Sequence, residues 1–165
     1  MDWKRFWRHV VMTPFAARRA FPASTLEAIQ RSVSEQEKHH RGEIRFVVEA
    51  ELTTPQLRAG LTPRQRATEL FAQMGVWDTA ERTGVLVYVM LADHKVEILA
   101  DRGISAVIEP ATWQAICESM VAEFREGRFE AGSIRGIEAI AALLARHFPA
   151  NSDNANELPD RPLML

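Results

Sequence analysis

The chain has 165 residues, of which 47% are hydrophobic and 25% charged, enough for one globular domain and too few for two ordinary ones. Its formal net charge of -2 lacks the basic excess of nucleic-acid-binding proteins, so no nucleic-acid partner is expected. One cysteine, Cys117, can form neither an internal disulfide nor a cysteine-rich zinc site.

No apolar stretch approaches the ~20 residues that a membrane span needs. The longest early apolar run, Val10 to Met12, is too short for a signal peptide. We therefore expect a cytoplasmic protein, with the inner face of the membrane as a second location.

Residues 1–20 form a basic amphipathic segment. Its apolar side chains recur at helical spacing, on Trp3, Phe6, Trp7, Val10 and Val11. Its basic residues outnumber one acidic residue, Asp2, and they are Lys4, Arg5, Arg8, Arg18 and Arg19. Such a helix can pack on its own domain or on a partner chain, or it can make peripheral contact with an anionic membrane through residues 3–11.

The rest of the chain alternates between helical and strand patterns. Helices are predicted from Ser24 to about His40, from Thr62 to Met74, from Pro110 to Glu126 and from Phe129 to Phe148; strands are predicted over 43–52, 84–92 and 95–101. The last two strands flank a tight Asp93-His94 turn and form a β-hairpin.

This order predicts an α/β fold, in which a mixed central sheet containing a β-hairpin has helices on both faces, as a three-layer α/β/α sandwich. We expect the α/β domain to span residues 21–149. Residues 150–165 have no hydrophobic period and are predicted to form a disordered tail.

Two ends of the predicted sheet offer candidate sites. If the first two strands are parallel, four acidic residues meet at one end and could form an oxygen-rich site for calcium or magnesium: Asp101, Glu81, Asp78 and Glu43. Alternatively, these carboxylates are solvated and pair with Arg82 and Arg102, which could otherwise contact a phosphate or a partner.

The opposite end is the alternative site. It holds Asp93, Thr53 and Thr54, and ligands of parallel sheets commonly bind at this carboxyl end of the strands. No phosphate-binding loop, dinucleotide fingerprint, His-Glu-x-x-His motif or nucleophile elbow is present. The catalytic residues, if any, are therefore unknown.

Over residues 24–149 the chain resembles the TPM domain family, and most closely its small bacterial branch without signal peptide or membrane anchor. The resemblance depends on an ordered series of segments: Gly42-Glu-Ile-Arg-Phe-Val-Val48, Gly84-Val-Leu-Val-Tyr-Val89, Asp93-His-Lys-Val-Glu-Ile98, Asp101-Arg-Gly-Ile104, Phe124-Arg-Glu-Gly-Arg-Phe129 and His147-Phe-Pro149.

The resemblance implies an α/β/α sandwich, divalent-cation binding in some members, acid phosphatase activity in others, and a protein partner, with LemA-type membrane proteins often encoded nearby. The chain departs from the better-studied branch at Asp101-Arg-Gly103 and at Arg82-Thr83. We therefore expect an accessory domain that binds a divalent cation and a protein partner. The alternative is a metal-dependent phosphatase acting on phosphate monoesters, in which Asp101 and Glu81 would hold the cation and Arg82 or Arg102 would steady the phosphate.

Overall fold

The computed structural model describes residues 2–152 and 155–165. Its elements are α1 (Trp3–Val11), α2 (Pro14–Ala20), α3 (Ala23–Gln36), a 3-10 turn (Glu37–His39), β1 (Glu43–Glu49), α4 (Thr54–Arg58), α5 (Pro63–Gln73), β2 (Gly84–Met90), β3 (Lys95–Ala100), α6 (Arg102–Ser105), α7 (Pro110–Arg125), α8 (Phe129–His147) and β4 (Leu163–Met164).

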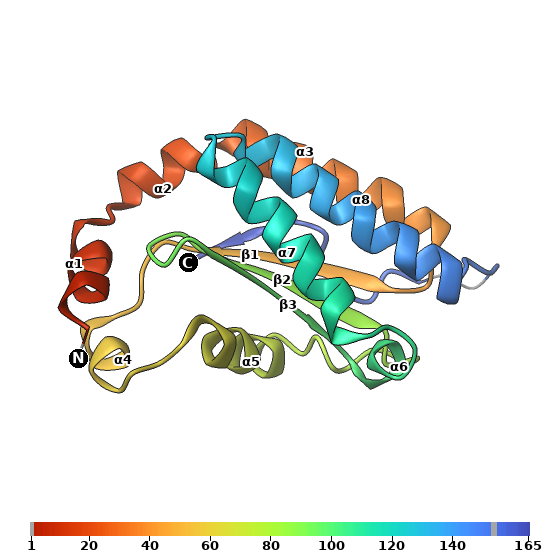
Figure 1. Ribbon diagram of the computed structural model, residues 1–165. Helices are drawn as coiled ribbons and strands as arrows, with labels where there is room; N and C mark the ends of the chain where they lie inside the picture. Colours follow the sequence, from red (N-terminus) through yellow and green to blue (C-terminus); the bar gives the residue numbers. More distant parts are fainter. Residues whose placement is uncertain (1, 153–154) are drawn as a thin grey trace.

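The strands form a mixed sheet in the order β3-β2-β1-β4. The pair β1 and β2 is parallel, with Glu43 opposite Gly84, whereas β2 and β3 form the predicted antiparallel hairpin. Helices α3, α7 and α8 cover one face and α5 covers the other (Figure 1). The α/β sandwich with a mixed sheet is therefore confirmed.

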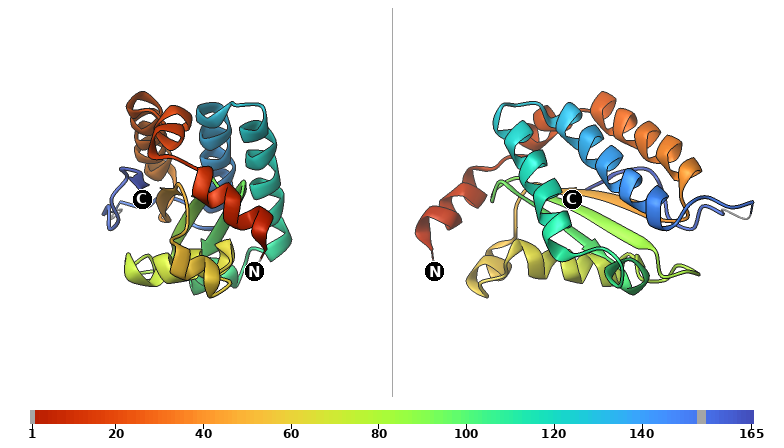
Figure 2. Two further views of the ribbon diagram at one scale, coloured as in Figure 1. Left: turned by 90° about the vertical axis from the view of Figure 1, so that its left-hand side faces the viewer. Right: turned by 45° about the vertical axis from the view of Figure 1, so that its right-hand side comes forward.

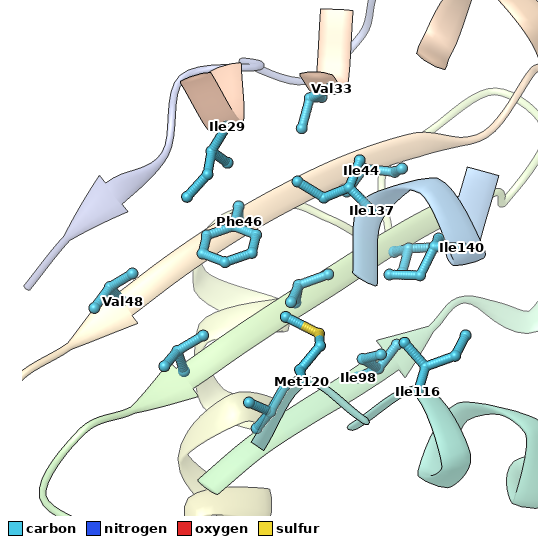
Figure 3. Close-up of a cluster of buried hydrophobic side chains, with 14 of the residues drawn as sticks. Ile29, Val33, Ile44, Phe46, Val48, Ile98, Ile116, Met120, Ile137 and Ile140 are labelled. Atoms are coloured by element: carbon cyan, nitrogen blue, oxygen red, sulfur yellow. The ribbon is translucent and has the colours of Figure 1, made fainter. Parts of the chain in front are cut away.

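Strand alternation divides the core into two clusters, one on each face of the sheet. Facing α3, α7 and α8 are the side chains of one set of alternate strand residues (Figure 3), among them Ile44, Phe46, Val48 and Ile98. The other set, which includes Val47, Leu86, Tyr88 and Met90, packs against α5 and the segments around it. Both central strands are thus buried on both faces.

This double burial places charged side chains of β1 inside the protein. Glu49 is buried, and its carboxylate receives hydrogen bonds from Arg66 of α5 (2.9 Å to Oε1) and from the Tyr88 hydroxyl (2.6 Å to Oε2). Burial, together with the neighbouring Glu49, raises the pKa of Tyr88. Arg66 and Glu49 therefore tie α5 to the sheet through an ion pair shielded from water.

The structure differs from the predicted disordered tail at residues 155–165; residues 153 and 154 lie outside the described residues. Met164 pairs with Val48, which adds β4 in parallel to the edge of β1. Leu158 is buried, and its N–H donates to Glu43 at 3.0 Å. Arg45 donates to the carbonyls of Pro159 and Arg161. The aperiodic tail is thus held by hydrogen bonds, which a hydrophobic pattern cannot reveal.

The N-terminal segment also differs from the single helix predicted at residues 1–20. Thr13 caps a second helix by accepting from the N–H of Ala16 at 3.1 Å, and Pro14 occupies its first turn. The two helices connect the layer of α3, α7 and α8 to the turn end of the hairpin, and they lie outside the layers of the sandwich (Figures 1 and 2).

Gly84 provides a test of the close packing at the start of β2. A Cβ there would lie 1.9 Å from the carbonyl oxygen of Val76, which belongs to the backbone and cannot rotate away. We expect Gly84→Ala to lower the free energy of unfolding by about 3 kcal/mol in urea titrations.

Gly42→Ala is the matched comparison, because its Cβ would meet the flexible Leu144 side chain at 2.7 Å. We expect this variant to lose only about 1 kcal/mol. Equal losses in the two variants would contradict the assignment of the larger cost to the backbone contact.

Candidate functional site

The predicted cation site lies at the amino end of the two parallel strands. Glu43 pairs with Gly84, and the N–H of Asp101 donates to the Gly84 carbonyl at 2.9 Å, so both acids reach the same end of the sheet. They lie on either side of β2, and two strand spacings separate their backbones by about 10 Å. The sheet brings them to one end without joining them.

Each of these acids has a different environment. Glu81 forms an ion pair with Arg41, Glu43 accepts from the Leu158 N–H, and Asp78 is exposed. Burial raises the pKa of Glu43. Within residues 2–152 and 155–165, no group of three or more His, Cys, Asp or Glu side chains is arranged to hold a metal ion.

Asp101 differs from the other acids because part of its carboxylate has no partner. Oδ1 accepts from the N–H of Arg102 at 2.7 Å and caps α6. Oδ2 is buried and has no hydrogen-bond partner among the described residues, and Asp101 as a whole is 7% exposed. A buried carboxylate oxygen without a donor is costly, and among the four predicted ligands Asp101 is the one with such an oxygen in the described part of the chain.

Arg82 and Arg102 flank this end of the sheet. Both are exposed, and Arg82 adopts a left-handed backbone with φ of 57°. Their predicted contact with a phosphate or a partner stays a prediction.

At the carboxyl end of the strands, the alternative site is filled by the chain itself. The Asp93 carboxylate, 5% exposed, receives Arg5 Nη2 at 2.7 Å and Arg5 Nε at 2.9 Å. Arg8 Nη2 lies 3.3 Å away, and Arg5 also donates to the Leu61 carbonyl at 2.8 Å. Burial is the largest single effect and opposes ionisation of Asp93, but the hydrogen bonds and charge of Arg5, together with His9, outweigh it and lower the pKa of Asp93.

His9 completes this contact between α1 and the hairpin turn. Its Nδ1 accepts the Leu52 N–H at 2.9 Å, which leaves the proton of the neutral ring on Nε2, 3.2 Å from Asp93 Oδ1. Burial lowers the pKa of His9 and outweighs the opposing effect of Asp93. The neutral tautomer is therefore the one that accepts the Leu52 N–H, and its Nε2 lies beside Asp93 without meeting hydrogen-bond geometry.

The two threonines predicted beside Asp93 have another role. Thr53 precedes α4 and forms a capping box with Gln56, whose Oε1 accepts from the Thr53 N–H at 2.8 Å. Thr54 is the first residue of that helix. A capped helix thus follows the first strand, in a stretch for which no helix was predicted.

Docking through Arg5 and His9 turns the apolar side of α1 outward. Phe6 is half-buried and packs on the core cluster that faces α5. Trp3, Trp7, Val10 and Val11 are 61%, 58%, 51% and 66% exposed. The hydrophobic pattern does not indicate which side of α1 packs on the domain. The signal that could have indicated it is the i, i+4 spacing of Arg5 and His9, because both side chains face the buried Asp93.

The comparisons with known proteins now identify the family. The TPM domain model matches residues 17–143, so the chain belongs to the TPM domain family. The chain is similar to the BA42 protein of the psychrophilic bacterium Bizionia argentinensis, solved by NMR, with 29% identity and a TM-score of 0.76. That match covers 87% of this chain and 94% of the BA42 chain. No curated protein matches the sequence.

In the part of the chain that the structure describes, no helix has both the length and the apolar character needed to cross a bilayer.

The Asp93 contact predicts how α1 is released. Arg5→Ala leaves the buried carboxylate short of its main partner, and losing such a partner typically costs about 3 kcal/mol or more. We expect hydrogen exchange to show reduced protection of α1 and of the Leu52 amide, while the strands keep theirs. Arg18→Ala, an exposed arginine of α2, is the control and should change nothing.

The same contact predicts a pH dependence. Because the pKa of His9 is lower in the folded protein than its ordinary value of 6.5, its contribution to docking is complete above about pH 6.5 and is lost as the pH falls. Protonated Nδ1 can no longer accept the Leu52 N–H. Protection factors for α1 should therefore fall below pH 6.5 in the wild type; protection that rises on acidification would contradict this assignment.

Proposed function

We propose that this chain is an accessory TPM domain that works by binding, and that α1 attaches it to an anionic membrane surface. The observation that carries the proposal is the orientation of α1: its polar side is fixed on Asp93, and its tryptophans face outward. The membrane is then the place where the domain meets its protein partner, for which the family resemblance implies a LemA-type protein.

The chemistry of the exposed surface supports a membrane. Tryptophan and aliphatic side chains insert at the boundary between headgroups and acyl chains, and nearby cations gain about 1 kcal/mol each at an anionic surface. The exposed cations nearby are Lys4 and Arg8 on α1 and Arg18 and Arg19 on α2. Phe15 of α2, 75% exposed, extends the apolar surface.

Binding, rather than hydrolysis, is favoured by the arrangement of the acids. Glu81 is engaged by Arg41 and Glu43 by Leu158, so these two predicted ligands already have protein partners. A phosphatase would need these side chains to leave their partners.

Vesicle sedimentation tests the membrane proposal. The wild-type chain should bind vesicles containing phosphatidylglycerol and should bind pure phosphatidylcholine weakly. Raising the salt from about 0.1 M to about 0.5 M should weaken binding, because screening reduces the attraction between exposed charges. Strong, salt-insensitive binding to phosphatidylcholine, or no binding to either vesicle, would contradict the proposal.

A tryptophan pair provides the matched variants. Trp3→Ala with Trp7→Ala should lower the affinity for anionic vesicles at least about tenfold, since each removes a large apolar side chain from the surface. Trp77→Ala is the control: Trp77 is 54% exposed but lies beyond α5, so its loss should leave binding unchanged. All variants should keep the wild-type unfolding midpoint.

A second proposal, cation binding at Asp101, is supported by the partnerless Oδ2. Calcium titration followed by amide NMR should give saturable shifts at Gly84 and Arg102. Asp101→Asn should abolish them while keeping the α6 cap, whereas Glu138→Gln, an exposed acid on α8, should not. The absence of shifts at millimolar metal would exclude the site. Phosphate release from p-nitrophenyl phosphate in saturating metal would favour the phosphatase alternative.

A further inference from the structure

We propose that a second binding site lies under α2 and takes a single-chain anionic amphiphile, such as a fatty-acid carboxylate. A groove of about 800 Å³ lies where α2, the hairpin turn, the end of α7 and the start of α8 meet. This volume is in the range of small-molecule sites. The groove is separate from the Asp93 contact and from the acids at the Asp101 end, and its use does not depend on membrane attachment.

The lining of the groove is mainly apolar. Phe124 and Phe129 stack with ring centroids 5.3 Å apart and an interplanar angle of 27°. Met12, Leu91 and Val121 continue this surface, and Leu91 belongs to the buried core. An alkyl chain laid along these side chains would lose water on most of its length, which favours binding in proportion to the area covered.

Cations gather around this apolar surface. Arg19 of α2, Lys95 of the hairpin and Arg125 of α7 all line the groove, and none of them forms an ion pair within the described residues. Arg128, a fourth cation of the lining, is held by Glu123 at 2.6 Å. The acid of the lining, Glu130, accepts a hydrogen bond from Thr25 at 2.9 Å.

This combination selects the chemistry of the ligand. Cations from three separate elements that line one groove attract an anion, and an anion bound there would reduce their mutual repulsion. An inorganic anion would satisfy the cations and leave the apolar lining in contact with water. A neutral hydrocarbon would cover the lining and leave the cations uncompensated. A carboxylate or phosphate head on one alkyl chain satisfies both.

Amide NMR on the full chain, in the absence of vesicles, tests the proposal. Dodecanoate below its micelle concentration should give saturable shifts at Leu91, Lys95 and Phe129. Octanoate should bind at least about tenfold more weakly, because it buries fewer methylene groups. Dodecanol should also bind more weakly, because it lacks the charge. Equal binding of the three ligands, or shifts confined to other surfaces, would overturn the proposal.

Two charge variants locate the head group. Arg125→Gln and Lys95→Gln should each weaken dodecanoate binding about tenfold, the usual effect of losing a charge-assisted hydrogen bond. Arg146→Gln, an exposed arginine at the far end of α8, should leave it unchanged. Hexaglutamate is the probe for an acidic peptide: tight binding of hexaglutamate in the same groove would overturn the amphiphile in favour of a peptide ligand. Because no membrane is present, failure here leaves the vesicle result untouched.

Discussion

The burial of β1 on both faces is the constraint on which much of the structure depends. Three of its seven residues are ionisable, and a charge without a partner in such a place is strongly unfavourable. Each therefore has its own solution: Arg66 of α5 for Glu49, and backbone groups of the C-terminal segment for Glu43 and Arg45. The positions of α5 and of the C-terminal segment thus depend on pairing the buried charges of β1 as much as on hydrophobic contact.

Asp93 is another buried charge that needs partners, and these come from the N-terminal helix α1. Its carboxylate is nearly inaccessible at the end of the hairpin, and the cations that compensate it come from a helix more than 80 residues earlier in the chain. Using the polar side of α1 for docking leaves most of its apolar side exposed, because only Phe6 packs on the core while Trp3 and Trp7 do not. An amphipathic helix usually packs its apolar side on the core and exposes its polar side. The opposite orientation of α1 is that of a helix whose apolar side is presented to another surface.

The sequence predicted most of the core elements, because hydrophobic periodicity reports directly on which strands and helices are buried. The strand predicted over 84–92 is observed as Gly84–Met90, and the predicted Asp93-His94 turn joins it to β3 as a hairpin. The sequence could not predict β4 or the partners of the acids at the Asp101 end. Whether Glu81 meets a metal or Arg41 depends on a residue 40 positions away, and Leu158 reaches Glu43 from 115 positions away. Such long-range polar pairings leave no local pattern.

The short strand β4 has a bearing on self-association. Exposed sheet edges offer unpaired N–H and C=O groups to other chains, and proteins protect them in various ways. Here Leu165 occupies the hydrogen-bonding groups of Val48 and Ala50, at 2.8 and 3.2 Å, and Arg45 fastens the segment just before it. The opposite edge, β3, begins with an exposed lysine. A chain shortened by its last few residues would keep its core but leave the edge of β1 unpaired. Proteolytic trimming would therefore make this edge available for β-sheet pairing with other chains, and so prone to aggregation.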